Sequence, residues 1–315
     1  MKYVEFGTTG QKISAIAFGC MSLTREREDN AKAAFLRAFE LGITLFDTAD
    51  IYGRGISEEI LGEVLREGKI SREQVIIASK CSIVSPGMND AYTYKAYDLS
   101  PAYLKASCEA SLKRLGTDYI DLYQPHRIDY LTHPQETARA LDELKTEGKI
   151  RHVGVSNYTP DEIRALSAYV RVESLQTQFS LLHLEPLETG LASVCLEKKM
   201  NILCWSPLYG GILTGTKPLE HQDWQQQRES GVVTQVGEFA RKYGFTSAQV
   251  SLAWLMHLPG GVIPLVGTAN ADHVQEATQA VDVQLARDDW YELMVIARGR
   301  PMPWRQRPYV YVKEH

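Results

Sequence analysis

Short apolar segments alternate with longer amphipathic segments along most of the chain. The short segments are rich in Val, Ile and Leu, which is typical of strands buried on both faces. Eight segments fit this description: Ala15–Gly19, Thr44–Asp47, Val75–Lys80, Ile120–Gln124, His152–Ser156, Ser174–Gln178, Ile202–Ser206 and Val262–Val266. Because amphipathic helices separate them, the pattern predicts an α/β fold, a closed (β/α)8 TIM barrel.

An additional pair of short segments precedes the first barrel strand. Tyr3–Phe6 and Gln11–Ile13 flank the turn Gly7-Thr8-Thr9-Gly10, a combination that predicts an N-terminal β-hairpin.

Several expected helices carry local start and stop signals. Helix starts are expected at Ser100-Pro101 and at the capping boxes Thr159-Pro160-Asp161-Glu162 and Thr246-Ser247-Ala248-Gln249. Helix ends with a left-handed residue are expected at Gly42, Gly68, Gly116 and Gly148.

The main alternative to the barrel is a doubly wound open sheet. No G-x-G-x-x-G motif follows the first strand, so the dinucleotide site typical of that fold is missing. No low-complexity tract or linker divides the chain, and we interpret residues 1–315 as a single barrel domain.

Composition narrows the function classes. The chain is 44% hydrophobic with a net charge of −5, which argues against nucleic acid as a partner. It opens with no signal-peptide pattern and has no apolar run of the ~18 residues that span a bilayer. Five scattered cysteines without a C-x-x-C pair favour a reducing compartment over disulfides or zinc. We therefore expect a cytoplasmic protein without a membrane or metal site.

Polar side chains stand where the second, third and fourth strands end, and a barrel carries its chemistry at that end. Asp47 closes the second strand, Tyr52 follows five residues later, Lys80 closes the third, and His126-Arg127 follow the fourth. Singly, such residues more often cap a helix or pack in a core. Their joint placement around one mouth favours a catalytic cluster.

Five segments resemble the aldo-keto reductase family in order and spacing: FDTADIYG at 46–53, IASK at 77–80, LGTDYID at 115–121, GKIRHVGVSN at 148–157 and WSPL at 205–208. The similarity runs from the hairpin to about residue 280. It is closest to the bacterial branch with Lys80-Cys81 after strand three and His126-Arg127 after strand four. The resemblance implies reversible hydride transfer between a nicotinamide coenzyme and an aldehyde or ketone, with Asp47, Tyr52, Lys80 and His126 as the catalytic tetrad.

The chemistry of the tetrad can be argued independently. Hydride arriving at a carbonyl carbon leaves an alkoxide that needs a proton. A phenol has a pKa of ~10, and one ammonium ~4 Å away supplies roughly 4 kcal/mol to lower it. We therefore expect Lys80 to activate Tyr52 as general acid and base, and Asp47 to pair with Lys80. His126 either orients the carbonyl oxygen or helps to relay the proton.

The resemblance also implies a coenzyme site. Ser156, Asn157 and Gln178 would hold the nicotinamide carboxamide, and Trp205 would stack beneath the ring; the structural alternatives are a turn and rim packing. The loop Gly210-Gly211-Ile212-Leu213-Thr214 would wrap the pyrophosphate through its N–H groups. Gly267, Thr268 and Asn270, leading into a helix at Asp272, would meet the adenosine end. The expected set is completed by Gly19, Met21, Asp47, Ser206, Leu208 and His273.

Coenzyme choice departs from the family pattern. NADP-preferring relatives usually carry Lys or Arg at the place of Asn270, because a 2′-phosphate requires a cationic partner. We expect NADP(H) to be favoured, with NAD(H) possible because Asn270 is neutral.

Substrate contacts are expected from Met21, Tyr52, His126 and Arg127. The loop Ser82–Leu99 and the tail 298–315 are expected over or near the barrel mouth, with subunit contact or simple packing as equal alternatives. The substrate, the direction of reaction and the oligomeric state stay open.

One alternative function is a coenzyme-binding regulatory module with little turnover. A metal-assisted hydrolase using Asp47 and His126 would need further His or Asp at strand ends five to seven, where the sequence offers none.

Overall fold

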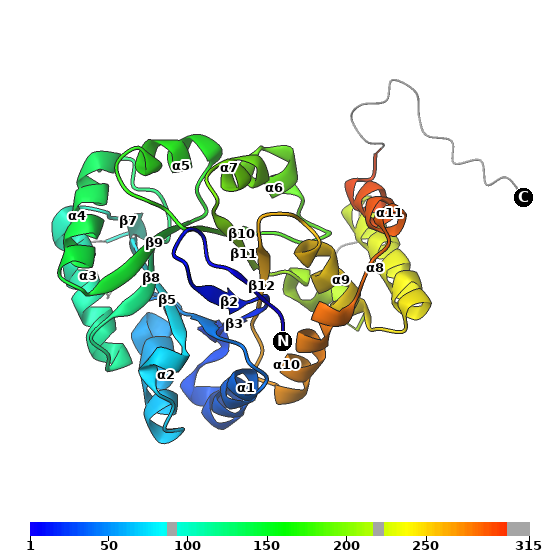
Figure 1. Cartoon of the computed structure of the whole chain (residues 1–315), viewed down its shortest axis with the longest axis horizontal. Coiled ribbons are helices and arrows are strands. Elements are labelled where there is room, and N and C mark those ends of the chain that lie inside the picture. The colour runs from blue at the N-terminus through cyan, green and yellow to red at the C-terminus, as the bar shows by residue number, and fades with distance from the viewer. Residues whose placement is uncertain (87–92, 217–223, 301–315) are drawn as a thin grey trace, which may run out of the picture.

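Eight parallel strands close into a barrel in the order β10-β11-β12-β3-β4-β5-β8-β9 (Figure 1). The structure is a computed structural model that describes residues 1–86, 93–216 and 224–300, without the side chains of 224–228. The barrel strands are β3 (Ala17–Gly19), β4 (Leu45–Asp47), β5 (Ile76–Cys81), β8 (Ile120–Pro125), β9 (Ile150–Ser156), β10 (Ser174–Gln178), β11 (Asn201–Trp205) and β12 (Val262–Val266). The predicted (β/α)8 TIM barrel is confirmed, and each predicted strand overlaps one of these.

Two antiparallel hairpins accompany the barrel. β1 (Tyr3–Glu5) pairs with β2 (Lys12–Ser14), as predicted, and Figure 1 shows this hairpin lying across one end of the barrel. β6 (Ile83–Val84) pairs with β7 (Ala96–Tyr97) inside the segment predicted only as a loop. Residues 87–92 between them, including Tyr92, lie outside the described residues.

Helices surround the strands and return the chain between them (Figure 1). The α-helices are α1 (Glu28–Glu40), α2 (Ile56–Glu67), α3 (Pro101–Leu115), α4 (Pro134–Thr146), α5 (Pro160–Ser167), α6 (Glu185–Glu188), α7 (Leu191–Glu197), α8 (Trp224–Tyr243), α9 (Ser247–Met256), α10 (Ala271–Thr278) and α11 (Arg287–Arg298). Short 3-10 helices are η1 (Cys20–Ser22), η2 (Arg25–Arg27), η3 (Tyr52–Gly55), η4 (Arg72–Gln74), η5 (Tyr209–Thr214) and η6 (Gln279–Asp282). None of the described helices is long and apolar enough to cross a membrane.

The predicted helix starts at Ser100, Thr159 and Thr246 are confirmed, because each side chain accepts a hydrogen bond from the first turn. Gly42, Gly116 and Gly148 are left-handed, as predicted.

The prediction for Gly68 is wrong. Its φ is −75°, its N–H still donates to Val64 O at 2.9 Å, and the left-handed residue is Lys69 at φ +51°. A Cβ on Gly68 would lie 3.0 Å from Val64 O and 3.1 Å from Leu36 Cδ2. The lack of space for a Cβ, rather than the backbone conformation, therefore explains why position 68 is a glycine.

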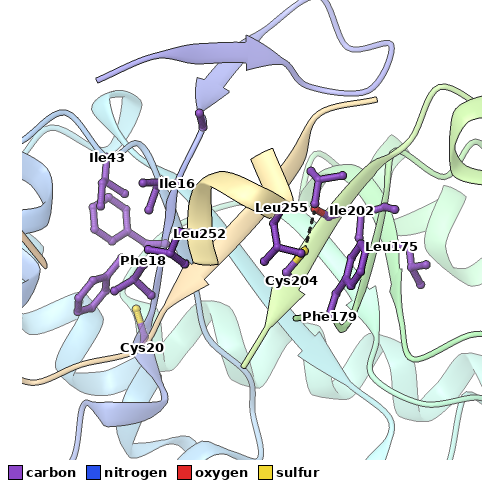
Figure 2. Packing of buried hydrophobic residues seen from close by; sticks show 14 of the residues in the cluster. Ile16, Phe18, Cys20, Ile43, Leu175, Phe179, Ile202, Cys204, Leu252 and Leu255 are labelled. Atoms are coloured by element: carbon purple, nitrogen blue, oxygen red, sulfur yellow. Dashed lines mark hydrogen bonds between the residues drawn. The ribbon is translucent and has the colours of Figure 1, made fainter. Parts of the chain in front are cut away.

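The strands send alternate side chains to two different cores. Ala17, Leu45, Ala78, Leu122 and Leu203 point inward and form a cluster with Phe6 and Ile13 of the first hairpin, which plugs that end. The intervening side chains point outward and pack against the helices. Figure 2 shows part of this outer layer, with Phe18 near Ile43 on one side and Leu252 and Leu255 of α9 between Phe18 and the β11 residues Ile202 and Cys204.

Candidate active site

Lys80 stands at the centre of a buried polar cluster inside the barrel mouth. Its side chain is fully buried, and Nζ donates to Asp47 Oδ2 at 2.8 Å, to Thr48 O at 2.7 Å and to Tyr52 OH at 3.4 Å. β4 and β5 are neighbours in the barrel, and both Asp47 and Lys80 occupy inward positions near the strand ends. The predicted pairing of Asp47 with Lys80 is present in the structure.

The electrostatic balance at Tyr52 differs from the sequence-based expectation. Burial raises the pKa of the half-buried phenol above its ordinary value, and the ammonium of Lys80 offsets this only in part. Desolvation and the negative charge of Asp47 both disfavour the phenolate. Together they outweigh the attraction of the Lys80 ammonium. The prediction of a net lowering of the Tyr52 pKa is therefore wrong, and Tyr52 is a protonated phenol at neutral pH.

Lys80 itself remains charged despite its burial. Burial alone would lower its pKa, but Asp47 and Tyr52 outweigh that effect and raise it. The cluster therefore holds a fixed ammonium beside a neutral proton donor.

Gln176 was not identified from the sequence and completes the surroundings of Asp47. Its Nε2 donates to Asp47 Oδ1 at 2.7 Å across the barrel, and the side chain is buried. Lys80 and Gln176 thus occupy the two carboxylate oxygens, which removes the free carboxylate that a metal-assisted hydrolase would need. The available signal was its position two residues before Gln178, because such residues share one face of a strand.

His126 lies edge-on to Tyr52, with ring centroids 6.0 Å apart. Its main-chain N–H donates to Cys81 O at 2.7 Å, which extends the β5–β8 ladder past the strand end and fixes the residue at the mouth. Burial lowers the pKa of its imidazole to about 2, with Lys80 and Arg127 contributing. The neutral ring favours orientation of an oxygen over a relay through imidazolium. Its Nδ1 is buried without a hydrogen-bond partner in the described part of the chain.

Asn157 connects three strand ends beside His126. Its Nδ2 donates to His126 O at 3.2 Å and to Ser156 Oγ at 2.8 Å, and its Oδ1 accepts from Trp205 Nε1 at 3.0 Å. Gln178 pairs in register with Trp205. The four residues predicted to contact nicotinamide, Ser156, Asn157, Gln178 and Trp205, are thus neighbours along one side of the mouth.

The predicted pyrophosphate loop has an unusual backbone. Ser206, Tyr209, Gly210 and Gly211 all have φ between +49° and +93°, and Gly211 N donates to Leu208 O at 2.9 Å. The two glycines adopt this left-handed path without a side chain in the way. Leu213, by contrast, is fully buried in the outer core, so its side chain contributes packing.

The predicted adenosine segment leads from β12 into α10. Gly267 approaches Gly19 closely, since a Cβ on Gly19 would lie 3.5 Å from Gly267 Cα. Asn270 is the N-cap of α10, and its Oδ1 accepts from Asp272 N at 2.9 Å. His273 Nδ1 lies 3.5 Å from Thr268 Oγ1.

Other predicted residues lie around the rim. Met21 in η1 is 68% exposed, and Arg127 is half-buried after β8. Of the predicted tail, Arg298 and Arg300 pair with Glu188, while residues 301–315 lie outside the described residues. The described part of the chain contains no group of three His, Cys, Asp or Glu side chains able to hold a metal.

A model of the aldo/keto reductase family matches residues 15–297. This chain belongs to that family. Membership, together with the closed barrel, makes it an NAD(P)H-dependent carbonyl oxidoreductase.

Named relatives span almost the whole chain. A 6-dehydroglucose reductase of Novosphingobium aromaticivorans is 35% identical over 95% of this chain and 96% of its own. A probable aldo-keto reductase of Glycine max is 32% identical over 92% and 87%. Among solved structures, the glycerol dehydrogenase AKR11B4 from Gluconobacter oxydans has a TM-score of 0.86 at 25% identity, covering 97% of this chain and 98% of its own. The thermostable aldo-keto reductase Tm1743 has a TM-score of 0.78 at 27% identity, covering 94% and 100%.

Proposed function

We propose that Tyr52 donates the proton to the carbonyl oxygen during reduction and recovers it during alcohol oxidation. The observation that carries this proposal is the contact of Tyr52 OH with the buried Lys80 ammonium at 3.4 Å. The raised pKa keeps the phenol protonated, which is the form a proton donor needs.

Lys80 stabilises the phenolate that forms when Tyr52 gives up its proton. Opposite charges 3.4 Å apart attract by roughly 5 kcal/mol at an effective dielectric of ~20. Asp47 holds Lys80 in place, and Gln176 in turn holds Asp47. The stabilisation is therefore largest after proton transfer, which is where it accelerates the reaction.

His126 orients the carbonyl oxygen as a neutral imidazole. Its low pKa keeps it uncharged, so one ring nitrogen can donate a hydrogen bond to the oxygen while Tyr52 supplies the proton. Met21 and Arg127 stand at the rim, where they would contact the rest of the substrate.

The mouth also suits a nicotinamide coenzyme, which supplies or accepts the hydride. Ser156, Asn157 and Gln178 provide hydroxyl and amide groups, and Trp205 provides a flat ring; a carboxamide on an aromatic ring needs both. Ser206, Leu208, Gly210, Gly211 and Leu213 would follow the pyrophosphate, and Gly19, Gly267, Thr268, Asn270 and His273 the adenosine end. NADP(H) is the favoured coenzyme.

The relatives' names favour a carbonyl on a small polyhydroxylated compound. They concern 6-dehydroglucose and glycerol. An apolar aromatic aldehyde is the contrasting candidate, because Tyr97 and Met21 expose apolar surface.

Two experiments in sequence test the proposal. Coenzyme binding is first titrated by intrinsic tryptophan fluorescence, and loss of reduced coenzyme is then followed with 6-dehydroglucose, dihydroxyacetone and benzaldehyde. Turnover with at least one carbonyl is expected. Tight coenzyme binding with no turnover across a broad carbonyl panel would instead favour the alternative of a regulatory module. The intact Asp47–Lys80–Tyr52 contacts argue against that alternative.

We place the protein in the cytosol. All five cysteines are free thiols in the structure, which suits a reducing compartment.

A further inference from the structure

A cavity of about 380 Å³ opens between two segments that are far apart in the sequence. One wall consists of Arg27 and Asn30, at the end of η2 and in the first turn of α1. The other consists of Thr268, Ala269, Asn270 and His273, at the start of α10. The first segment was not linked to coenzyme binding by the sequence.

Packing fixes the distance between the two walls. α1 lies against α10, and Arg37 Nη2 donates to Gln275 Oε1 at 2.9 Å. Asn30 precedes Arg37 by seven residues, two helical turns, so both lie on the same face of α1. That face therefore presents Asn30, with Arg27 just before it, to the N-terminus of α10.

The charges in the cavity are unbalanced. Arg27 is exposed and lines the cavity, and no described carboxylate lies within 4.0 Å of its guanidinium, although its charge helps to lower the pKa of the adjacent Glu26. Its neighbour Arg25, by contrast, pairs with Glu28, Glu59 and Glu63. No carboxylate lines the cavity.

The α10 wall adds hydrogen-bond donors, and the carboxylate in the first turn of that helix, Asp272, is not among the residues that line the cavity. Asn270 uses its Oδ1 to cap Asp272 N, while the first-turn N–H groups of Ala271 and His273 have no partner within the helix. Helix N-termini of this kind attract anions. Thr268 adds a hydroxyl. The cavity thus combines an arginine on one wall with free N–H groups on the other, an arrangement that suits a phosphate monoester.

We propose that Arg27, on the α1 wall of this cavity, provides the counter-charge for the 2′-phosphate of NADP(H) and so sets the preference for NADP(H) over NAD(H). The proposal rests on the proposed function, since it concerns the same coenzyme. Arg27 then replaces the basic residue that is missing at position 270. Selection of NADP(H) over NAD(H) therefore depends on the first βα segment, and discrimination is stronger than Asn270 alone implies.

The test compares coenzyme affinities of the full chain and the Arg27→Met variant. Dissociation constants are measured by fluorescence titration for NADPH and NADH, and 2′-AMP and 5′-AMP serve as probes that do not depend on catalysis. Loss of a charge-assisted contact should weaken NADPH and 2′-AMP by about ten- to hundredfold. NADH and 5′-AMP should bind as before, and Arg27→Met/Asn270→Arg should regain NADPH affinity.

Arg139→Met is the matched control, because it removes the same charge from an exposed position on α4. Equal losses for NADPH and NADH in Arg27→Met would mean that Arg27 stacks on adenine and would overturn the proposal. Unchanged NADPH affinity would overturn it as well. Either result, in a chain that still reduces carbonyls with NADPH, would leave the proposed function standing. A wild-type chain that binds neither coenzyme would refute both.

Discussion

The two ends of the barrel are built from the same strands and have opposite chemistry. At the hairpin end the inward side chains are apolar: Leu45 on β4, Ala78 on β5 and Leu122 on β8. Two residues later on the same strands and the same face stand Asp47, Lys80 and Gln124. A single step of the two-residue strand period therefore separates a packed core from a charged site.

This difference has an energetic meaning. The hairpin end gains stability by removing Phe6 and Ile13 from water. The mouth instead holds a buried ion pair, whose desolvation offsets much of its attraction. Among the described residues it also leaves the amide of Gln124 and Nδ1 of His126 without partners. One end stabilises the fold and the other uses part of that stability to hold reactive groups.

Lys80→Met, at the polar end of the barrel, should have the largest effect of the variants considered. It should reduce carbonyl turnover by about 10²–10⁴-fold, because the Tyr52 phenolate loses its counter-charge. It should also destabilise the fold by roughly 3–5 kcal/mol, because Asp47 is left buried and unpaired. Steady-state kinetics and thermal unfolding measure the two effects.

The double variant Lys80→Met/Asp47→Asn serves as the control for Lys80→Met. It should regain stability without regaining turnover. Wild-type turnover in Lys80→Met alone would show that Lys80 takes no part in the reaction.

Phe6→Ala should affect the opposite end alone. Phe6 is fully buried and packs edge-on against His152, with centroids 5.5 Å apart. Its truncation should lower the free energy of unfolding by roughly 3–5 kcal/mol. Turnover measured well below the unfolding transition should stay close to wild type. A large loss of turnover in folded protein would show that the two ends are not separable.

Asp50→Asn, between the barrel and its helices, should change the free energy of unfolding by a smaller amount that depends on pH. Asp50 is buried; one oxygen accepts from Ser107 Oγ at 3.0 Å and the other has no partner among the described residues. Burial, aided by the charge of Glu58, raises its pKa to about 7. A raised folded-state pKa means that Asp50 contributes stability at low pH and that this contribution disappears as pH rises from about 4 to about 7.

The measurement for Asp50→Asn is the difference in unfolding free energy between variant and wild type across pH 5–8. The variant should gain on wild type by about 2–4 kcal/mol toward pH 8. His126, whose pKa is lowered to about 2, acts in the opposite sense, because its contribution disappears as pH falls below its ordinary value. It is present in both proteins and cancels in the difference. A pH-independent difference would contradict the assignment.

The fold was predictable because its signals are local. Each strand is a short apolar segment, and capping residues such as Thr159 and Thr246 act on their own helix turn. The pairing of Asp47 with Lys80 was predictable for the same reason, since a strand end in a barrel fixes where a side chain must lie.

What the sequence missed depends on distant neighbours. Gln176 reaches Asp47 across the barrel, and Arg27 meets α10 only because α1 packs there. The pKa direction of Tyr52 follows from burial, which no local pattern encodes. The strands β6 and β7 have two residues each, too few for any periodicity.

The central claim is that Tyr52 supplies the proton for carbonyl reduction at the polar end of the barrel. The most direct measurement is the rate of reduced-coenzyme oxidation by Tyr52→Phe at saturating carbonyl, with coenzyme affinity measured on the same preparation. The account predicts unchanged coenzyme affinity and a turnover lower by about 10²–10⁴-fold. Near-normal carbonyl reduction by Tyr52→Phe would contradict it.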